Sequence, residues 1–114
     1  ALEQIVHNLL SNALQALAQV PQGQRRLQLQ WQRDGAWALL TVSDSGPGIA
    51  PEALPRLFEP FFTTRDGGLG LGLSLCESLA TGMGGALTAG HAVPRGAAFT
   101  LRLPAGPDNP PIPA

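Results

Sequence analysis

The chain has 114 residues, which suffices for one domain and leaves no room for a second core of ordinary size. Hydrophobic residues make up 44%, charged residues make up 13% and the formal net charge is −1, so a packed core is possible and the basic excess that favours nucleic acid or an anionic membrane is absent. The single cysteine, Cys76, excludes an internal disulfide and predicts a reducing, cytoplasmic setting, while the sequence has neither an opening secretory signal nor an apolar run near the roughly 20 residues that span a bilayer.

Residues 2–18 predict an amphipathic helix, which Pro21 and Gly23 end. Its apolar residues recur at helical spacing: Leu2, Ile5, Val6, Leu9, Ala13, Leu14 and Leu17. Two strands follow, because residues 26–32 alternate with Leu27, Leu29 and Trp31 on one face, Asp34-Gly35 is a hairpin signal, and residues 36–44 read as the return strand.

Residues 45–69 predict a long loop with one short helix near 52–58. A second long helix is expected over 71–81, ended by nearby glycines, and two strands over 86–92 and 97–103. The last segment, 104–114, contains five prolines and predicts a disordered tail. This order favours a two-layer α/β sandwich with helices on one face of a sheet, and it matches a Rossmann domain poorly.

The first helix carries an uncharged polar stripe, formed by Gln4, Asn8, Ser11, Asn12 and Gln15. A solvated helix face usually carries Lys and Glu, and Asn is a mediocre helix former, so the pair Asn8 and Asn12 needs a reason. One interpretation is that amide oxygens bind a cation or its water molecules. The alternative is a polar face that happens to lack charge.

Asp44 ends the second predicted strand and points, by alternation, to the same face as the apolar Leu40 and Val42. A buried carboxylate needs a partner, and Gly46 and Gly48 allow a tight turn and the close approach of a flat ligand. An exocyclic amine such as that of adenine suits this acid. A plain turn with Asp44 as a local acceptor is the alternative.

Glycines alternate with leucines over residues 67–73 and lead into the second long helix. Backbone N–H groups and the positive end of a helix dipole together bind phosphate, whereas a flexible entry to a core helix is the alternative. The Gly-Lys-Ser/Thr ending of a Walker motif is missing. Three of the four phenylalanines fall within residues 58–62, which predicts that this loop folds over a base, a neighbouring helix or a small satellite core.

In their order and spacing these segments resemble the ATPase domain shared by histidine kinases, DNA gyrase, mismatch-repair ATPases and some chaperones, the GHKL superfamily. Residues 8–13 look like the N box of histidine kinases, 44–49 like the first glycine box, 58–64 like the F box and 68–73 like the second glycine box. Residues 96–104 look like the closing strand. The resemblance covers about residues 1–104, taken as one catalytic domain that begins inside the N-box helix, with 105–114 as its tail.

The resemblance implies a mixed, mostly antiparallel sheet packed against helices, and a domain that binds ATP with Mg²⁺. It implies phosphoryl transfer to a histidine on a separate dimerisation domain and then to an aspartate of a response regulator. Asn12 would be the main Mg²⁺ ligand, Asn8 would lie beside the phosphates and Asp44 would bind adenine. The other nucleotide-binding residues it implies are Gly46, Gly48, Ile49, Phe61, Thr63, Thr64, Gly68, Leu69, Gly70, Leu71 and Gly72.

The F box and short lid favour the histidine kinases. Residues 12–16, Asn-Ala-Leu-Gln-Ala, together with residues 60–65, Pro-Phe-Phe-Thr-Thr-Arg, are similar to the nitrogen-regulation and dicarboxylate-sensing type. Gln15 stands where many kinases have a lysine, so Arg65 becomes the candidate for charge near the phosphates. Ala97 replaces a common Thr, and the strand usual before the N-box helix is missing, which leaves a sheet edge or helix face bare.

Neither His7 nor His91 has the flanks of a phosphoacceptor box, so the acceptor is expected outside this chain, which would itself be monomeric. Two other functions stay open, namely a serine kinase of the anti-sigma type and a non-catalytic nucleotide-binding module that docks a partner. The lid, about residues 59–70, is expected to become ordered when ATP and Mg²⁺ bind.

Overall fold

The computed structural model describes residues 2–60 and 72–105. Two α-helices and four strands appear in the predicted order: α1 (Leu2–Leu17), β1 (Leu27–Asp34), β2 (Trp37–Asp44), α2 (Gly72–Gly82), β3 (Ala86–His91) and β4 (Ala97–Pro104). Two 3₁₀ turns complete them, η1 (Gln22–Gln24) and η2 (Leu54–Arg56). The short helix expected near residues 52–58 is therefore this single turn, η2.

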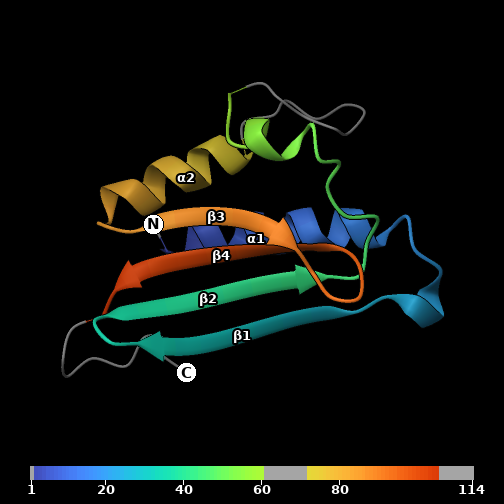
Figure 1. Cartoon of the computed structure of the whole chain (residues 1–114), viewed down its shortest axis with the longest axis horizontal. Coiled ribbons are helices and arrows are strands. Elements are labelled where there is room, and N and C mark those ends of the chain that lie inside the picture. Colours follow the sequence, from blue (N-terminus) through green and yellow to red (C-terminus); the bar gives the residue numbers. More distant parts are fainter. Residues whose placement is uncertain (1, 61–71, 106–114) are drawn as a thin grey trace.

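The four strands form one sheet in the order β1-β2-β4-β3, and both long helices cover the same face of it (Figure 1). Every pairing between these strands is antiparallel. The two-layer sandwich is thus confirmed, and within the described strands the sheet is wholly antiparallel rather than mixed. None of the described helices is both long and apolar enough to cross a membrane.

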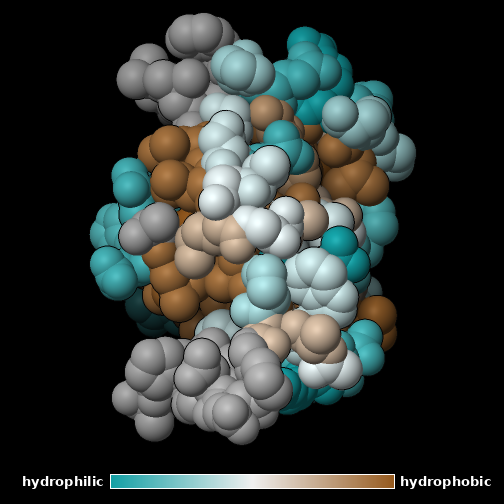
Figure 2. Space-filling model, turned by 90° about the vertical axis from the view of Figure 1, so that its left-hand side faces the viewer, coloured by the Kyte–Doolittle hydropathy of each residue, from teal (hydrophilic) through white to brown (hydrophobic). Residues whose placement is uncertain are grey.

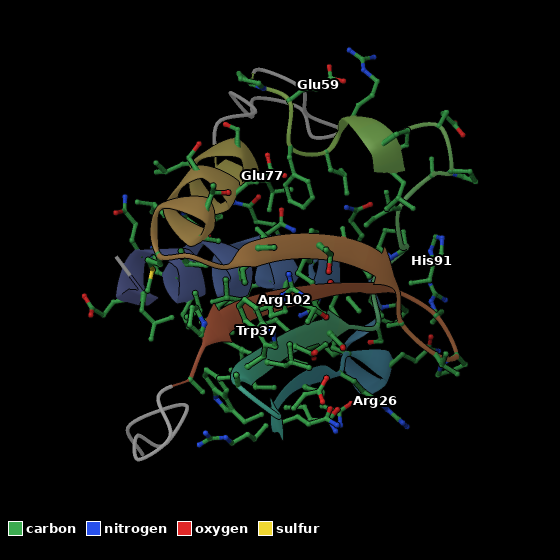
Figure 3. All side chains as sticks on the ribbon, turned by 60° about the vertical axis from the view of Figure 1, so that its left-hand side comes forward. Arg26, Trp37, Glu59, Glu77, His91 and Arg102 are labelled. Atoms are coloured by element: carbon green, nitrogen blue, oxygen red, sulfur yellow. The ribbon has the colours of Figure 1, made fainter. Side chains whose placement is uncertain are left out.

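The core lies between the sheet and the helices. Side chains of β2 and β4 alternate between buried and partly exposed, which places Leu40, Val42, Phe99 and Leu101 on the inner face. The outer face carries a hydrogen bond between the Thr41 and Thr100 hydroxyls. The Arg102 guanidinium lies over the ring of Trp37 on the same sheet, 4.3 Å from its centroid (Figure 3).

Helix α1 has one fully buried row of apolar residues and a second row that is buried only in part. Ile5, Leu9, Ala13 and Leu17 are buried, whereas Leu14, which the periodicity assigned to the apolar face, is 58% exposed. Placing Leu14 with the buried residues was therefore wrong, although Leu2, Val6 and Leu10, at the same spacing of four, are partly buried against the core. Figure 2 views the end of the molecule at which α1 begins and shows apolar atoms at the surface there.

Strand β1 has little cover on either face. Leu27 and Leu29 share a face, as their alternation predicted, but they are 38% and 46% exposed. The strand lies at the edge of the sheet and pairs only with β2, at the side away from α2 and β3 (Figure 1). A period of two therefore predicted which residues share a face, while the position of the strand in the sheet decides whether that face is covered.

Candidate functional site

A cavity of about 390 Å³ opens beside α1 and the loop that follows β2. This volume is within the range of small-molecule sites in proteins. Its walls come from α1, the end of β2, the loop after β2, the start of α2 and the start of β4. The lining residues are Asn8, Ser11, Asn12, Gln15, Ala16, Gln19, Asp44, Pro47, Gly48, Ile49, Ala50, Leu57, Gly72, Leu73, Ala97 and Phe99.

Within residues 2–60 and 72–105, Asp44 is the one charged residue that lines this cavity, and only 4% of its surface is exposed. Its Oδ1 atom accepts hydrogen bonds from the backbone N–H of Gly46, at 2.8 Å, and from that of Ala97, at 3.4 Å. Both N–H groups donate to the same oxygen, Oδ1, and the other carboxylate oxygen can also accept hydrogen bonds. The Asp44 carboxylate is thereby fixed in orientation and can still accept a hydrogen bond from a ligand.

Three glycines allow the backbone to close tightly around Asp44. A side chain on Gly46 would place Cβ 2.9 Å from Cβ of Ala16 in α1. A side chain on Gly96 would overlap the carbonyl oxygen of Asp44, and Gly48 has φ +84°. Gly48 lines the cavity as expected, whereas Gly46 lies behind that wall and holds the loop against α1.

The polar stripe of α1 runs along the cavity from this acid toward α2. Ala16, which contacts Gly46, marks the Asp44 end, and Asn8 lies eight residues earlier on the same helix. At 1.5 Å of rise per residue the two positions are roughly 12 Å apart. Asn12 and Gln15 lie between them and also line the cavity. An elongated ligand with one end on Asp44 would therefore reach the asparagines with its other end.

Helix α2 begins at the Asn8 end of the cavity. Gly72, its first residue, lines the cavity, and Cys76, one turn later, donates a hydrogen bond to the carbonyl of Ile5 at 3.8 Å. Burial raises the pKa of the Cys76 thiol, although a hydrogen bond with the Asn8 side chain acts in the opposite direction. The positive end of the α2 dipole and the amide of Asn8 thus lie together, where an anion is favoured.

The side-chain oxygens at the cavity suit a Mg²⁺ ion that has only one or two protein ligands. Within residues 2–60 and 72–105, no three His, Cys, Asp or Glu side chains come together as a metal cluster. Mg²⁺ is commonly held by one or two protein oxygens together with phosphates and water molecules. The amide oxygens of Asn8 and Asn12 could supply that share, and the anionic ligand would supply the rest.

The structure brings together most of the predicted site residues that it describes. Asn8, Asn12, Asp44, Gly48, Ile49 and Gly72 all line the cavity. Eight others, Phe61, Thr63, Thr64, Arg65, Gly68, Leu69, Gly70 and Leu71, lie outside the described residues, as does most of the predicted lid. Neither His7 nor His91 lines the cavity.

Several lining residues were not predicted as site residues. Ala16 lies one turn after Asn12 in α1, and Gln19 follows the end of the helix at a spacing of four from Gln15, so helical spacing alone could have found both. Leu57 and Phe99 reach the cavity from η2 and β4, and only the tertiary fold brings them there.

Comparison with known proteins identifies relatives over most of the chain. The sequence profile of the family described as "Histidine kinase-, DNA gyrase B-, and HSP90-like ATPase" matches residues 1–107. The two-component sensor PprA of Pseudomonas aeruginosa is 48% identical over 108 residues, covering 90% of this chain and 12% of PprA. The C4-dicarboxylate transport sensor protein DctB of the same species is 44% identical over 104 residues, covering 90% of this chain and 17% of DctB. The chain therefore spans less than a fifth of the length of either relative.

Solved structures of histidine kinases are also similar to this chain. The mycobacterial sensor histidine kinase MprB is 34% identical with a TM-score of 0.76, and the match covers 89% of this chain and 70% of that one. Full-length ShkA, solved in complex with AMPPNP, is 34% identical with a TM-score of 0.80, and the match covers 97% of this chain and 23% of that one. On its sequence and its fold, the chain belongs to the family of histidine kinase-, DNA gyrase B- and HSP90-like ATPases, and within that family it is similar to the catalytic domains of sensor histidine kinases.

Proposed function

We propose that this chain binds Mg²⁺-ATP in the cavity beside α1 and donates the γ-phosphoryl group to a histidine on a separate dimerisation domain. The phosphoryl group then passes to an aspartate of a response regulator. The observation that carries the proposal is the length of the cavity, which has a fixed buried carboxylate at one end and two amides with a helix start at the other. Full-length ShkA, a solved relative, has been seen in complex with the ATP analogue AMPPNP.

Each part of the nucleotide has a counterpart along this cavity. Asp44 accepts a hydrogen bond from the exocyclic amine of adenine, and Gly48 and Ile49 form the wall beside the base. Asn12 binds Mg²⁺, and Asn8 lies with the start of α2 beside the phosphates. Gly72, which lines the cavity, and Arg65, Gly68 and Gly70, which lie outside the described residues, complete the phosphate site in this proposal.

The chemistry that this chain supplies is positioning and charge neutralisation, which is most of what phosphoryl transfer asks of a protein. Bound Mg²⁺ neutralises phosphate charge. Asn8 holds the phosphate end and cannot activate water, because an amide does not accept a proton at neutral pH. The incoming histidine therefore supplies the nucleophile, and hydrolysis of ATP by the domain alone is slow.

The first test is transfer of radiolabel from ATP. The chain alone is expected to bind ATP without labelling itself, and a supplied dimerisation domain with its histidine should become labelled weakly, since separate pieces lose the effective concentration of a shared chain. Acid-labile label on the chain alone, abolished by His7→Ala or His91→Ala, would contradict the proposal. Acid-stable label on a serine of the partner would favour the serine kinase, and ATP binding without any transfer would favour the docking module.

A second test separates the metal from the nucleotide. Asn12→Ala should remove most of the Mg²⁺ dependence of ATP binding, since it deletes the amide oxygen that is proposed to bind Mg²⁺. Gln4→Ala is the matched control, because Gln4 is an amide on the same stripe that does not line the cavity. Calorimetric titrations with and without Mg²⁺ measure the effect, and an unchanged Mg²⁺ titration for Asn12→Ala would exclude this role.

A further inference from the structure

Two loops meet behind the Asp44 end of the cavity, at the end of the sheet that lies on the right in Figure 1. One follows β2 and contains Gly46 and Gly48, and the other joins β3 to β4. Asp44 joins them, because its Oδ1 accepts from Gly46 in the first loop and from Ala97 at the end of the second. The fit is close, since a Cβ on Gly48 would lie 3.4 Å from the carbonyl oxygen of Gly96.

Arg95 adds a side-chain link between the same two loops. Its Nε donates a hydrogen bond to the carbonyl oxygen of Gly46 at 3.3 Å, in a partly buried position. Gly46 is therefore held at both of its peptide groups, because Asp44 accepts from its N–H and Arg95 donates to its carbonyl. A glycine has no side chain with which to fix its own conformation, so these two bonds do so.

The carbonyl that Arg95 holds belongs to the peptide group that Gly46 shares with Pro47. Pro47 and Gly48 line the cavity directly after it. The peptide group is planar and the ring of Pro47 fixes its φ, so rotation of the Gly46 carbonyl would move Pro47 and the wall with it. We propose that Arg95 is a positioning residue that fixes the wall of the cavity against the nucleotide base. This inference rests on the proposed function.

The test measures the affinities of the full 114-residue chain for ATP and GTP by calorimetry. Arg95→Ala is expected to weaken ATP binding by about 2- to 10-fold, the range that one net hydrogen bond supports. The preference for ATP over GTP should fall with it, because the displaced wall faces the base. The Mg²⁺ dependence should stay unchanged, because Asn12 is held by α1 and not by this loop.

Two further variants make the result specific. Arg95→Lys keeps a cationic donor and should recover part of the ATP preference. Arg102→Ala removes the same charge from β4, where the guanidinium lies over Trp37, and should leave both affinities unchanged. A merely structural role would lower the melting temperature without moving the ATP-to-GTP ratio measured well below that temperature.

Asp44→Asn separates this inference from the proposed function. If Asp44→Asn weakens ATP binding and Arg95→Ala leaves both the affinity and the ATP-to-GTP ratio unchanged, the role of Arg95 is wrong and the proposed function stands. If neither variant has an effect, the proposed adenine site itself is wrong. If Arg95→Ala does not fold, Arg95→Met replaces it, because methionine keeps an aliphatic side chain and lacks the donor, and a wild-type ATP-to-GTP ratio in Arg95→Met would overturn the inference.

Discussion

Replacing Gly96 by alanine is expected to lower the free energy of unfolding by at least about 3 kcal/mol. Gly96 has φ +105°, and a Cβ at this position would overlap the carbonyl oxygen of Asp44. An L side chain is strained at such a φ, and the overlap is with backbone atoms that cannot turn aside as a side chain can. The neighbouring N–H of Ala97, which donates to Asp44, would move as well. Urea unfolding of the variant measures the loss.

Substitutions at two other glycines separate the cost of the backbone conformation from the cost of the steric overlap. Gly35→Ala introduces a side chain at φ +60° with nothing within 4 Å, so it should lose only about 1–2 kcal/mol from the conformation itself. Gly23→Ala meets neither obstacle and should change stability by less than about 0.5 kcal/mol. Equal losses for Gly96→Ala and Gly35→Ala would mean that the approach of Gly96 to Asp44 is not a rigid contact.

Asp44→Asn is expected to weaken ATP binding by roughly 1–3 kcal/mol, about 5- to 150-fold. One oxygen of the asparagine can still accept from Gly46 and Ala97, so the fold should survive. The atom that replaces the other oxygen is then an N–H₂ group, which donates toward the cavity where adenine also presents a donor. Because guanine presents an acceptor in the corresponding position, the variant should lose its preference for ATP over GTP.

Calorimetry of both nucleotides gives the ratio directly. Asp34→Asn makes the same chemical change at the exposed end of β1 and should leave both affinities as they are. Wild-type affinities for ATP and GTP that are equal, or an Asp44→Asn affinity for ATP that matches wild type, would remove Asp44 from the adenine site.

The sequence predicted the element order and the face of Asp44 because both depend on local spacing. Alternation with Leu40 and Val42 placed the acid on the inner face, and it is buried there. The same reasoning failed for Leu14, because helical spacing places it in line with Val6 and Leu10 but does not show how far along the helix the core extends. Alternation also placed Leu27 and Leu29 on one face, but whether that face is covered depends on the position of β1 in the sheet, which is a property of the whole chain.

In the candidate site, too, features set by local spacing could be predicted and features set by distant contacts could not. The i, i+4 asparagines and the glycines of the first box could be named from the sequence because their pattern is local. Arg95 carried no such signal, since its partner Gly46 is 49 positions away in the chain. The reason for a glycine at position 46 was also non-local, because the lack of space beside Ala16 in α1 requires it.

The β1–β2 hairpin turn has a consequence for engineering. Residues 27–34 contribute nothing to the lining of the cavity, and a Cβ on Gly35 would meet open space. Exposed turns of this kind are the places where proteins accept inserted segments. A reporter peptide or a second domain inserted after Gly35 would therefore lie at the edge of the sheet that is remote from α2. The described residues that line the cavity would all be kept.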